Sequence, residues 1–90
     1  KISLRTVENL DNYSIEKFHY TIGKNVKRLR ERKGYSQLAL SQALGHKSAG
    51  LVSQAEIYYK QQHFNLEHLV KIAYILECTV EDFFQESVGE

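Results

Sequence analysis

Apolar residues recur every three or four positions along most of the chain. After Ser14 these positions are Ile15, Phe18, Ile22, Val26 and Leu29. The spacing places them on one stripe of an α-helix that ends near Gly34. Ser14 and Thr21 are both suitable N-caps and Gly23 weakens the middle, so the pattern predicts a helix that starts at either of the two.

Two shorter helical patterns follow, separated by a glycine and a polar turn. The first opens at Ser36, whose hydroxyl can accept a free backbone N–H, and runs to Gly45, which can adopt positive φ. Ser48 offers a second N-cap. One face of the next helix then carries Val52, Ala55 and Tyr59. The pattern predicts a helix, a tight turn and a second helix.

Two further helices are expected near the C-terminus. Asn65 is a suitable cap for a fourth helix, whose periodic apolar residues are Leu66, Leu69, Val70, Ala73 and Leu76. Thr79 with Asp82 three positions later resembles a capping box and leads into Phe83 and Phe84, which predicts a brief fifth helix. Cys78 is expected to be a small buried apolar residue. Residues 1–13 fit a short strand, an arm or a disordered segment.

Composition supports one small helical domain. Ninety residues with 42% hydrophobic content can build one core but not two. We therefore expect an all-α, compact five-helix bundle with a central helix-turn-helix. Residues 1–20 are assigned to an N-terminal extension or the start of the first helix, 21–86 to the helical domain and 87–90 to a C-terminal tail. No apolar run approaches membrane-spanning length and no signal peptide pattern is present, so we expect a cytoplasmic protein without a membrane partner.

Charge is distributed very unevenly although the net charge is only +1. Between residues 21 and 47 seven basic residues are opposed by Glu31 alone, a local charge of +6. From residue 64 onward six acidic residues are opposed by Lys71 alone, a local charge of −5. This asymmetry predicts one face that attracts a polyanion, and an ordinary solvated helix face is the alternative.

Motifs for catalysis or metal binding are absent from the sequence. The single cysteine cannot form an internal disulfide, and no CxxC pair or HExxH occurs. There is also no phosphate-binding glycine loop, no Ser/His/Asp arrangement of recognisable spacing and no pair of carboxylates in an apolar setting. We expect no enzyme activity, no metal and no cofactor.

The order of these features resembles a known family of DNA-binding proteins. The matching segments are IGKNVKRLRERKGYSQ, LALSQALG, VSQAE, NLEHLVKIAYIL and VEDFF. From Ile22 to Phe84 the chain is similar to the lambda repressor/Cro-like (XRE-type) helix-turn-helix family. The chain departs from the family by one extra residue in the turn between Gly45 and Val52, and by Ser41 where most members have alanine.

The resemblance implies that the third helix lies in the major groove of double-stranded DNA. It also implies that Gln37 contacts a phosphate and that Arg30 pairs with Glu56 to fix the third helix. Gln54 is the best candidate for a base contact, because its amide can pair with adenine. The residues expected at the DNA interface are Gln37, Lys47, Ser48, Ala49, Gly50, Ser53, Gln54, Lys60 and Asn65. For Asn65, capping of the fourth helix is the favoured role.

Two functions from different classes are consistent with this pattern. The first is a sequence-specific DNA-binding regulator, most simply a repressor that acts as a homodimer on half-sites roughly 34 Å apart. Phe83, Phe84 and Val88 could form its dimer interface or could close the core. The second is an antitoxin-like subunit that binds a partner protein and its own operator. Residues 1–20 or the C-terminal end would contact that partner.

Overall fold

The computed structural model describes residues 4–86 of the chain, and within this range every regular element is helical. The α-helices are α1 (Asn12–Arg32), α2 (Gln37–Ala43), α3 (Gly50–Ala55) and α4 (Leu66–Leu76). Three 3₁₀-helices complete the set, η1 (Val7–Asn9), η2 (Tyr59–Gln61) and η3 (Val80–Phe84). The expected all-α class is therefore confirmed. The described residues hold four α-helices instead of five, because the last element is a 3₁₀-helix.

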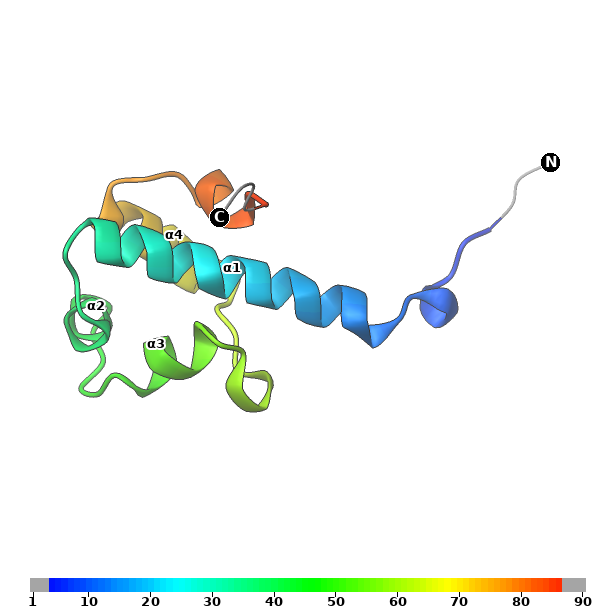
Figure 1. The fold of residues 1–90 in the computed structure, drawn as a ribbon, viewed down its shortest axis with the longest axis horizontal. Helices are drawn as coiled ribbons and strands as arrows, with labels where there is room; N and C mark the ends of the chain where they lie inside the picture. Colours follow the sequence, from blue (N-terminus) through cyan, green and yellow to red (C-terminus); the bar gives the residue numbers. More distant parts are fainter. Residues whose placement is uncertain (1–3, 87–90) are drawn as a thin grey trace.

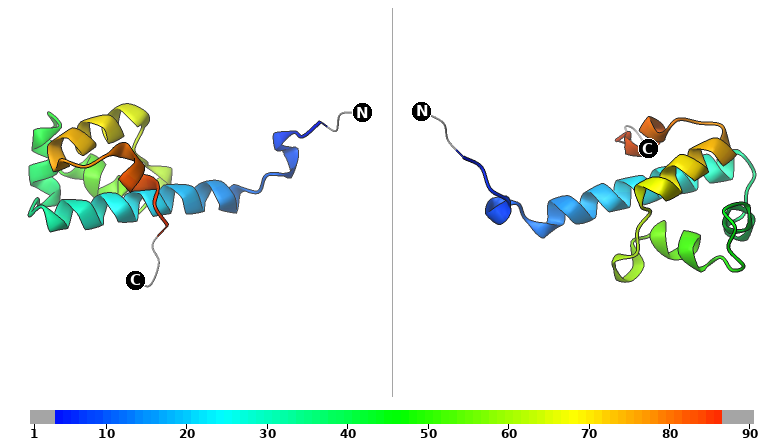
Figure 2. Two further views of the ribbon diagram at one scale, coloured as in Figure 1. Left: turned by 90° about the horizontal axis from the view of Figure 1, so that it is seen from above. Right: turned by 180° about the vertical axis from the view of Figure 1, so that it is seen from behind.

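The helices assemble around α1, which runs along the whole bundle and projects beyond it (Figure 1). In this view α2 and α3 lie below the C-terminal half of α1, α4 lies behind it and η3 lies above it. The two views of Figure 2 agree with this arrangement. The core between these elements contains Ile22, Val26, Leu40, Val52, Phe64, Leu69, Ile72, Leu76 and Phe83.

Helix α1 is longer at its N-terminal end than the sequence predicted. It begins at Asn12, and its N-cap is Asp11, whose carboxylate accepts a hydrogen bond from the Ser14 N–H at 2.9 Å. Neither Ser14 nor Thr21 is the cap. The boundary drawn between residues 20 and 21 falls inside the helix, whose N-terminal half projects beyond the bundle (Figure 1). Residues 4–11 form an exposed arm with one 3₁₀ turn and no strand.

The predicted apolar stripes are only partly buried. Ile22 and Val26 of α1 lie in the core, but Ile15 and Phe18 are exposed because the bundle does not extend to them. On α4, Leu69, Ala73 and Leu76 are buried as expected, whereas Leu66 and Val70 are exposed, and Ile72 takes an inward position. Leu66 and Val70 therefore belong to the helix that the pattern predicted, but they stay exposed because the apolar arc of α4 is wider than the face that the core covers.

The C-terminal segment is held to α1 by a buried polar side chain. Thr79 and Asp82 form a reciprocal capping box, as expected, and Phe83 is fully buried. The Asn25 amide donates hydrogen bonds to the carbonyls of Phe83 at 2.9 Å and Gln85 at 2.7 Å. Phe83 therefore closes the core and is not available for a dimer interface. Val88 and the tail 87–90 lie outside the described residues.

Two remaining expectations concern Cys78 and the membrane. Cys78 is half-buried against the core, not fully buried, and burial raises the pKa of its thiol.

Over the described range, none of the helices combines the length and apolar character needed to cross a bilayer.

Candidate nucleic-acid interface

Two single residues determine where α2 starts and how the chain turns after it. Ser36 caps α2, since its hydroxyl accepts a hydrogen bond from the Ala39 N–H at 2.9 Å. Gly45 adopts φ +96° just after the helix, and the His46 N–H then bonds back to the Ser41 carbonyl at 2.9 Å. This left-handed conformation strains any residue with a Cβ, so glycine allows the sharp turn toward α3.

Helix α3 differs from its prediction at both ends. Its N-cap position is Ala49, which has no side-chain cap, and Ser48 only accepts a hydrogen bond from the Gly50 N–H at 3.4 Å. At the other end Tyr58 adopts a left-handed conformation with φ +55°, so the helix stops at Ala55. Tyr59 therefore lies outside α3 and is exposed, contrary to the prediction that it faces the core.

A buried polar network holds the C-terminal end of α3 against α1 and α2. The Arg30 guanidinium donates to both carboxylate oxygens of Glu56, at 2.7 and 3.2 Å, and also to the Tyr35 carbonyl at 2.7 Å. The Gln37 amide donates to the same carboxylate at 3.0 Å. Arg30 and Glu56 are 5% and 2% exposed, so each charge relies on these partners instead of water. The network joins the ends of three helices.

Gly23 allows α1 and α3 to approach closely at the same place. A Cβ atom added to Gly23 would overlap the backbone carbonyl of Glu56 and would lie 2.9 Å from the Ala55 oxygen. The sequence pattern marked Gly23 as a weak point of the first helix. Its role is instead to let the end of α3 pack directly on the α1 backbone.

Close packing also explains the small residue at position 41. Ser41 of α2 is fully buried, as its place in the helix-turn-helix pattern implied for a small side chain. Its hydroxyl finds no hydrogen-bond partner among residues 4–86. An alanine at this position would occupy the same space without an unsatisfied polar group.

The outer side of α3 presents few polar groups. Gln54 is exposed, and Ile57 just beyond the helix is 58% exposed. Ala49, Gly50 and Ser53 are half-buried, and the Ser53 hydroxyl donates to the Gly50 carbonyl at 3.2 Å. Of the residues proposed to read bases, Gln54 is therefore the one whose polar atoms face solvent from α3.

Two residues assigned to phosphate contacts also have structural roles. Gln37 is half-buried, and one of its donors is taken by Glu56. Asn65 caps α4, with its side-chain oxygen accepting from the His68 N–H at 2.7 Å while His68 Nδ1 accepts from the Asn65 N–H at 3.1 Å. This reciprocal capping box matches the role favoured for Asn65 from the sequence.

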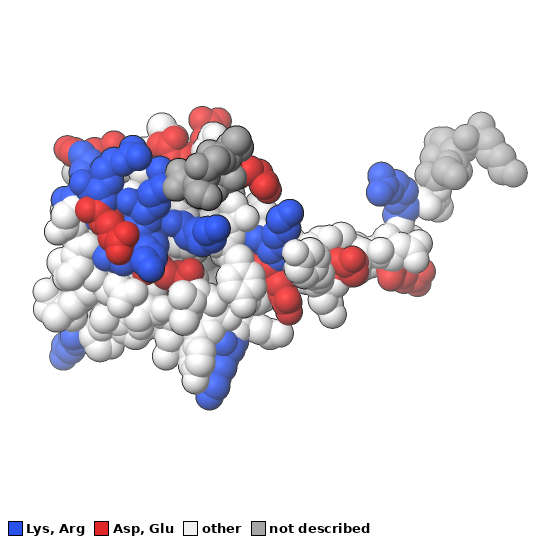
Figure 3. Space-filling model, in the orientation of Figure 1, with Lys and Arg blue, Asp and Glu red and all other residues white. Residues whose placement is uncertain are grey.

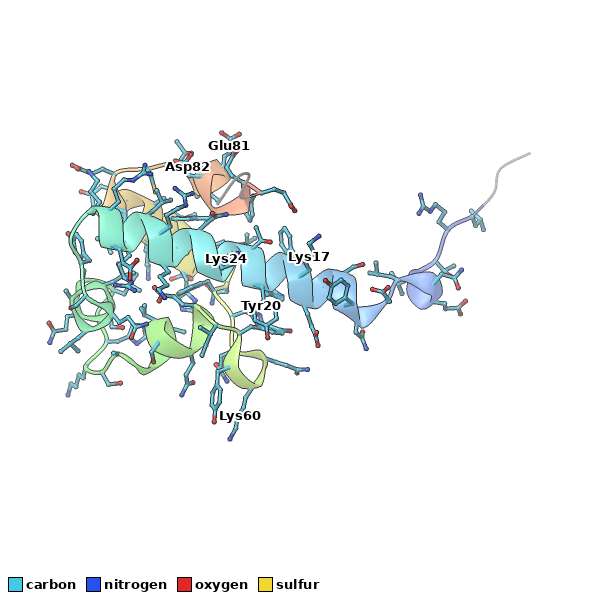
Figure 4. The ribbon with its side chains drawn as sticks, in the orientation of Figure 1. Lys17, Tyr20, Lys24, Lys60, Glu81 and Asp82 are labelled. Carbon is cyan, nitrogen blue, oxygen red and sulfur yellow. The ribbon has the colours of Figure 1, made fainter. Side chains whose placement is uncertain are left out.

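Basic side chains gather mainly in one place on the face shown in Figure 3. Most Lys and Arg side chains on the face shown in Figure 3 lie over the C-terminal half of α1. Two isolated blue groups lie at the lower edge, below α2 and α3. Lys60 points away from the bundle at this lower edge, whereas Lys17 and Lys24 lie on α1 (Figure 4). The basic residues that the +6 segment contributes from α1 therefore do not form one surface with the outer side of α3.

Several cations on α1 and at its C-cap also have partners inside the molecule. Arg30 is buried against Glu56, and Lys33 pairs with Glu77 of the acidic C-terminal segment at 2.8 Å. Arg28 donates to the Asn25 side chain at 3.1 Å. The part of the +6 charge that can attract a polyanion is smaller than the count of residues indicated.

The loop after α3 packs on α1 through aromatic rings. The rings of His19 and His63 lie 4.3 Å apart, and those of His19 and Tyr58 lie 5.0 Å apart. Within the described residues, the buried Nδ1 of His19 has no hydrogen-bond partner, and burial lowers the pKa of His19, with a further contribution from His63. The left-handed residues Tyr58, Lys60 and Gln61 give this loop its shape.

Sequence reasoning missed three residues that shape this region, namely Gly23, Asn25 and His19. A glycine in the interior of a helix lowers its stability and often has a packing reason, so Gly23 could have been found. Asn25 lies beside Val26 on the inward side, but its partners are backbone carbonyls about sixty residues away. No local pattern predicts such contacts.

Comparison of the chain with protein-family models, with curated proteins and with solved structures found no match.

Proposed function

We propose that the chain is a sequence-specific, double-stranded DNA-binding protein of the lambda repressor-like helix-turn-helix type, acting as a transcriptional regulator. In this proposal α3 enters the major groove, whose width accommodates an α-helix. The N-terminal end of α2 and the residues flanking α3 contact the DNA backbone.

The observation that supports this proposal best is the buried network of Arg30, Glu56 and Gln37. It joins α1, α2 and the end of α3, and it leaves the opposite side of α3 toward solvent with Gln54 exposed. A short helix that is fixed this firmly but has an uncovered outer side suits the insertion of preorganised side chains into a groove.

Direct base readout by α3 is limited in this proposal. Gln54 can pair bidentately with adenine, and Ile57 can contact a thymine methyl group. Lys47 and Lys60 are exposed and supply phosphate contacts on either side of α3. With so few base-reading groups, part of the specificity comes from DNA shape and bridging water.

The test is DNA binding by fluorescence anisotropy as a function of salt, first on random-sequence duplexes and then on a site selected from them. Lys47→Ala and Lys60→Ala should weaken binding to all sequences and lower the slope of log K against log salt by about one each. Gln54→Ala should leave the slope unchanged and relax the preference at one base pair.

Lys24→Ala is the matched control, because Lys24 is an exposed lysine of the separate cluster on α1. It should bind DNA as the parent does. If Lys24→Ala lowers the slope and the other two lysine variants do not, DNA lies against α1 and the proposed role of α3 is wrong. No salt-dependent binding to any duplex would contradict the whole proposal.

A partner-binding, antitoxin-like role is the second candidate, and the projecting part of α1 favours it. Ile15 and Phe18 continue the apolar stripe of α1 beyond the bundle, where they are 44% and 52% exposed. Phe18 stacks on Phe84 at 5.7 Å, which extends the apolar surface toward η3. In this role Ile15→Glu abolishes copurification of a partner without changing DNA binding. Copurification unaffected by this substitution would count against the second candidate.

A further inference from the structure

The loop after α3 has an unusual backbone. Within residues 4–86, four residues other than glycine have positive φ, and three of them lie in this loop. They are Tyr58, Lys60 and Gln61, with φ of +55°, +50° and +66°. Residues with a Cβ atom rarely adopt this left-handed conformation unless surrounding contacts hold them in it. The shape of the loop therefore depends on contacts with the rest of the molecule.

The loop is anchored at both ends. At one end Glu56 is held by its buried ion pair, and at the other end Phe64 lies in the core with 4% exposed. Between these anchors Tyr58 is half-buried and the other residues are exposed. We call residues 57–63 the α3–α4 loop. This segment can change conformation without disturbing the core.

Aromatic rings hold the α3–α4 loop against α1. The His19 ring stacks on the His63 ring at 4.3 Å and on the Tyr58 ring at 5.0 Å. Tyr20 adds an edge-on contact with Tyr58 at 5.6 Å. The loop lies below the middle of α1 (Figure 1), and Lys60 points away from the bundle (Figure 4). The contacts with α1 therefore come from the two ends of the loop, not from its tip.

The surroundings of the two stacked histidines suit neutral imidazoles. His19 Nδ1 is buried and has no hydrogen-bond partner within residues 4–86, so a proton on this atom would be a donor without an acceptor. His63 Nδ1 lies 2.9 Å from the Gln61 carbonyl, which can only accept. Nδ1 therefore carries the proton of the neutral His63 ring, and a second proton goes to Nε2.

No acidic side chain compensates a positive charge on this pair. Among the described residues, none of the ion pairs involves a histidine. The other titratable groups nearby are Tyr58 of the loop and His68 of α4, whose pKa is lowered by burial, by His46 and, to a smaller extent, by His63. Burial and the proximity of His63 lower the pKa of His19. Two protonated rings at this distance repel each other.

We propose that His19 and His63 form a pH switch, in which the neutral rings hold the α3–α4 loop on α1 and protonation of the pair releases residues 57–63 while the bundle stays folded. Release also relaxes the left-handed residues of the loop. The ion pair of Arg30 and Glu56 contains no histidine, so it continues to hold the end of α3.

One consequence of the switch rests on the proposed function. The α3–α4 loop carries Lys60, which supplies a phosphate contact in that proposal, so DNA binding should weaken as the pH falls. The switch itself can be measured without DNA. Its failure is therefore distinguishable from a failure of DNA binding.

The test is backbone ¹⁵N relaxation of the full chain without DNA at about pH 7.5 and about pH 5.5. Order parameters of residues 57–63 should fall from about 0.85 to below about 0.6, whereas those of α1 and α4 should stay near 0.85. The change should follow the titration of the His19 and His63 rings in the same sample, with a midpoint below the ordinary histidine pKa of 6.5.

Two variants remove one charge each from the pair. His19→Phe keeps a ring beside Tyr58 and cannot be protonated, and a charged His63 is attracted to the face of the new ring. His63→Phe makes the same change from the exposed side of the pair, where the substitution does not enter the core. In both variants the α3–α4 loop should stay ordered at about pH 5.5. His46→Phe is the matched control, because exposed His46 belongs to the other histidine pair, 6.5 Å from His68, and should respond as the parent does.

Three results would overturn the proposal. They are a loop in the parent whose order parameters do not change with pH, an equal change in the parent and in both variants of the pair, and a loss of order that extends over α1 and α4. The last result would show global unfolding instead of a local switch. Loss of the response in His46→Phe alone would place the switch at the other histidine pair and would equally contradict the proposal.

Discussion

At the scale of single residues, stability depends on how the polar groups inside the bundle are satisfied. Arg30 and Glu56 are buried together and saturate each other with good geometry. The hydroxyl of Ser41 is buried without a partner among the described residues. Removing a polar group has opposite consequences in the two cases, because only the first leaves an uncompensated charge behind.

Ser41→Ala should increase the free energy of unfolding by about 1 kcal/mol, because it removes an unsatisfied buried hydroxyl without creating a large cavity. Urea denaturation measures this difference. Ser48→Ala, at an exposed serine, is the control and should have little effect. A loss of stability in Ser41→Ala would show that the hydroxyl has a favourable partner.

Glu56→Ala should lower the free energy of unfolding by about 3 kcal/mol or more, because the Arg30 charge is left buried without its carboxylate. Glu81→Ala removes an exposed carboxylate and is the control. Thermal melting of both variants distinguishes the two sites. An unchanged melting temperature for Glu56→Ala would refute the proposed structural role.

At the scale of elements, the position of α3 is set by contacts with α1 and with the loop that follows α3. The α1 backbone at Gly23 meets the carbonyls at the end of α3, and the rings of Tyr58 and His63 pack on His19. These contacts explain why a helix of six residues, too short to be stable alone, is held in one orientation.

Gly23→Ala should destabilise the protein by about 1–3 kcal/mol, because the added methyl group overlaps the Glu56 carbonyl and forces α1 and α3 apart. The sign of this stability change distinguishes two effects, since alanine stabilises a helix by about 1 kcal/mol relative to glycine where there is space for its methyl group. Lys24→Ala, next to it on the exposed side of α1, is the control for helix propensity. Urea denaturation giving Gly23→Ala equal or higher stability would contradict the close packing.

Stability should decrease as the pH falls from about 7 to 5. Burial lowers the pKa of His19 and of His68 below the ordinary value of 6.5. The unfolded chain then binds more protons than the folded chain in this range, so acidification favours unfolding. For His68 a further reason is that Nδ1 accepts the capping hydrogen bond from Asn65.

Urea denaturation at several pH values checks this dependence. The double variant His19→Gln/His68→Gln should show a flatter pH profile, because glutamine cannot titrate and can still close the capping box of α4. Equal pH dependence in the parent and the double variant would show that these two histidines are not responsible.

At the scale of the whole molecule, the described chain consists of a helical bundle and a projecting N-terminal part. The bundle contains the core and the proposed DNA-contacting elements, whereas residues 4–15 are exposed throughout. Large apolar side chains are exposed on the projecting part of α1, at Ile15 and Phe18, and also on α4, at Leu66, Val70 and Tyr74. The exposed residues on α1 support the partner-binding alternative.

A chain that begins at Asp11 should unfold with the same free energy as the parent within about 0.5 kcal/mol, because the described part of the removed arm packs on nothing in the core. Asp11 is retained because it caps α1. Removing the cap as well, by Asp11→Ala in the shortened chain, should cost about 1 kcal/mol. A large loss of stability from the deletion alone would show that the arm supports the bundle.

The sequence by itself determined the helical class, the caps at Ser36, Asn65 and Thr79, the glycine turn at Gly45 and most of the core. These features follow from local rules, since a cap or an apolar period depends on residues within one or two turns of each other. The Arg30 and Glu56 pair was expected from family resemblance, and no local rule would have found it.

Only the tertiary structure decided which apolar residues of each predicted helix are buried and which stay exposed. Ile15, Phe18, Leu66 and Val70 fit the periodic stripes, yet they are exposed because no other element reaches them. Three other features also depend on distant segments. They are the end of α3 at Ala55, the separation of the α1 cations from the outer side of α3, and the role of Gly23. A periodic pattern shows which face of a helix is apolar, but burial requires a second surface, and only the packing of the whole chain supplies one.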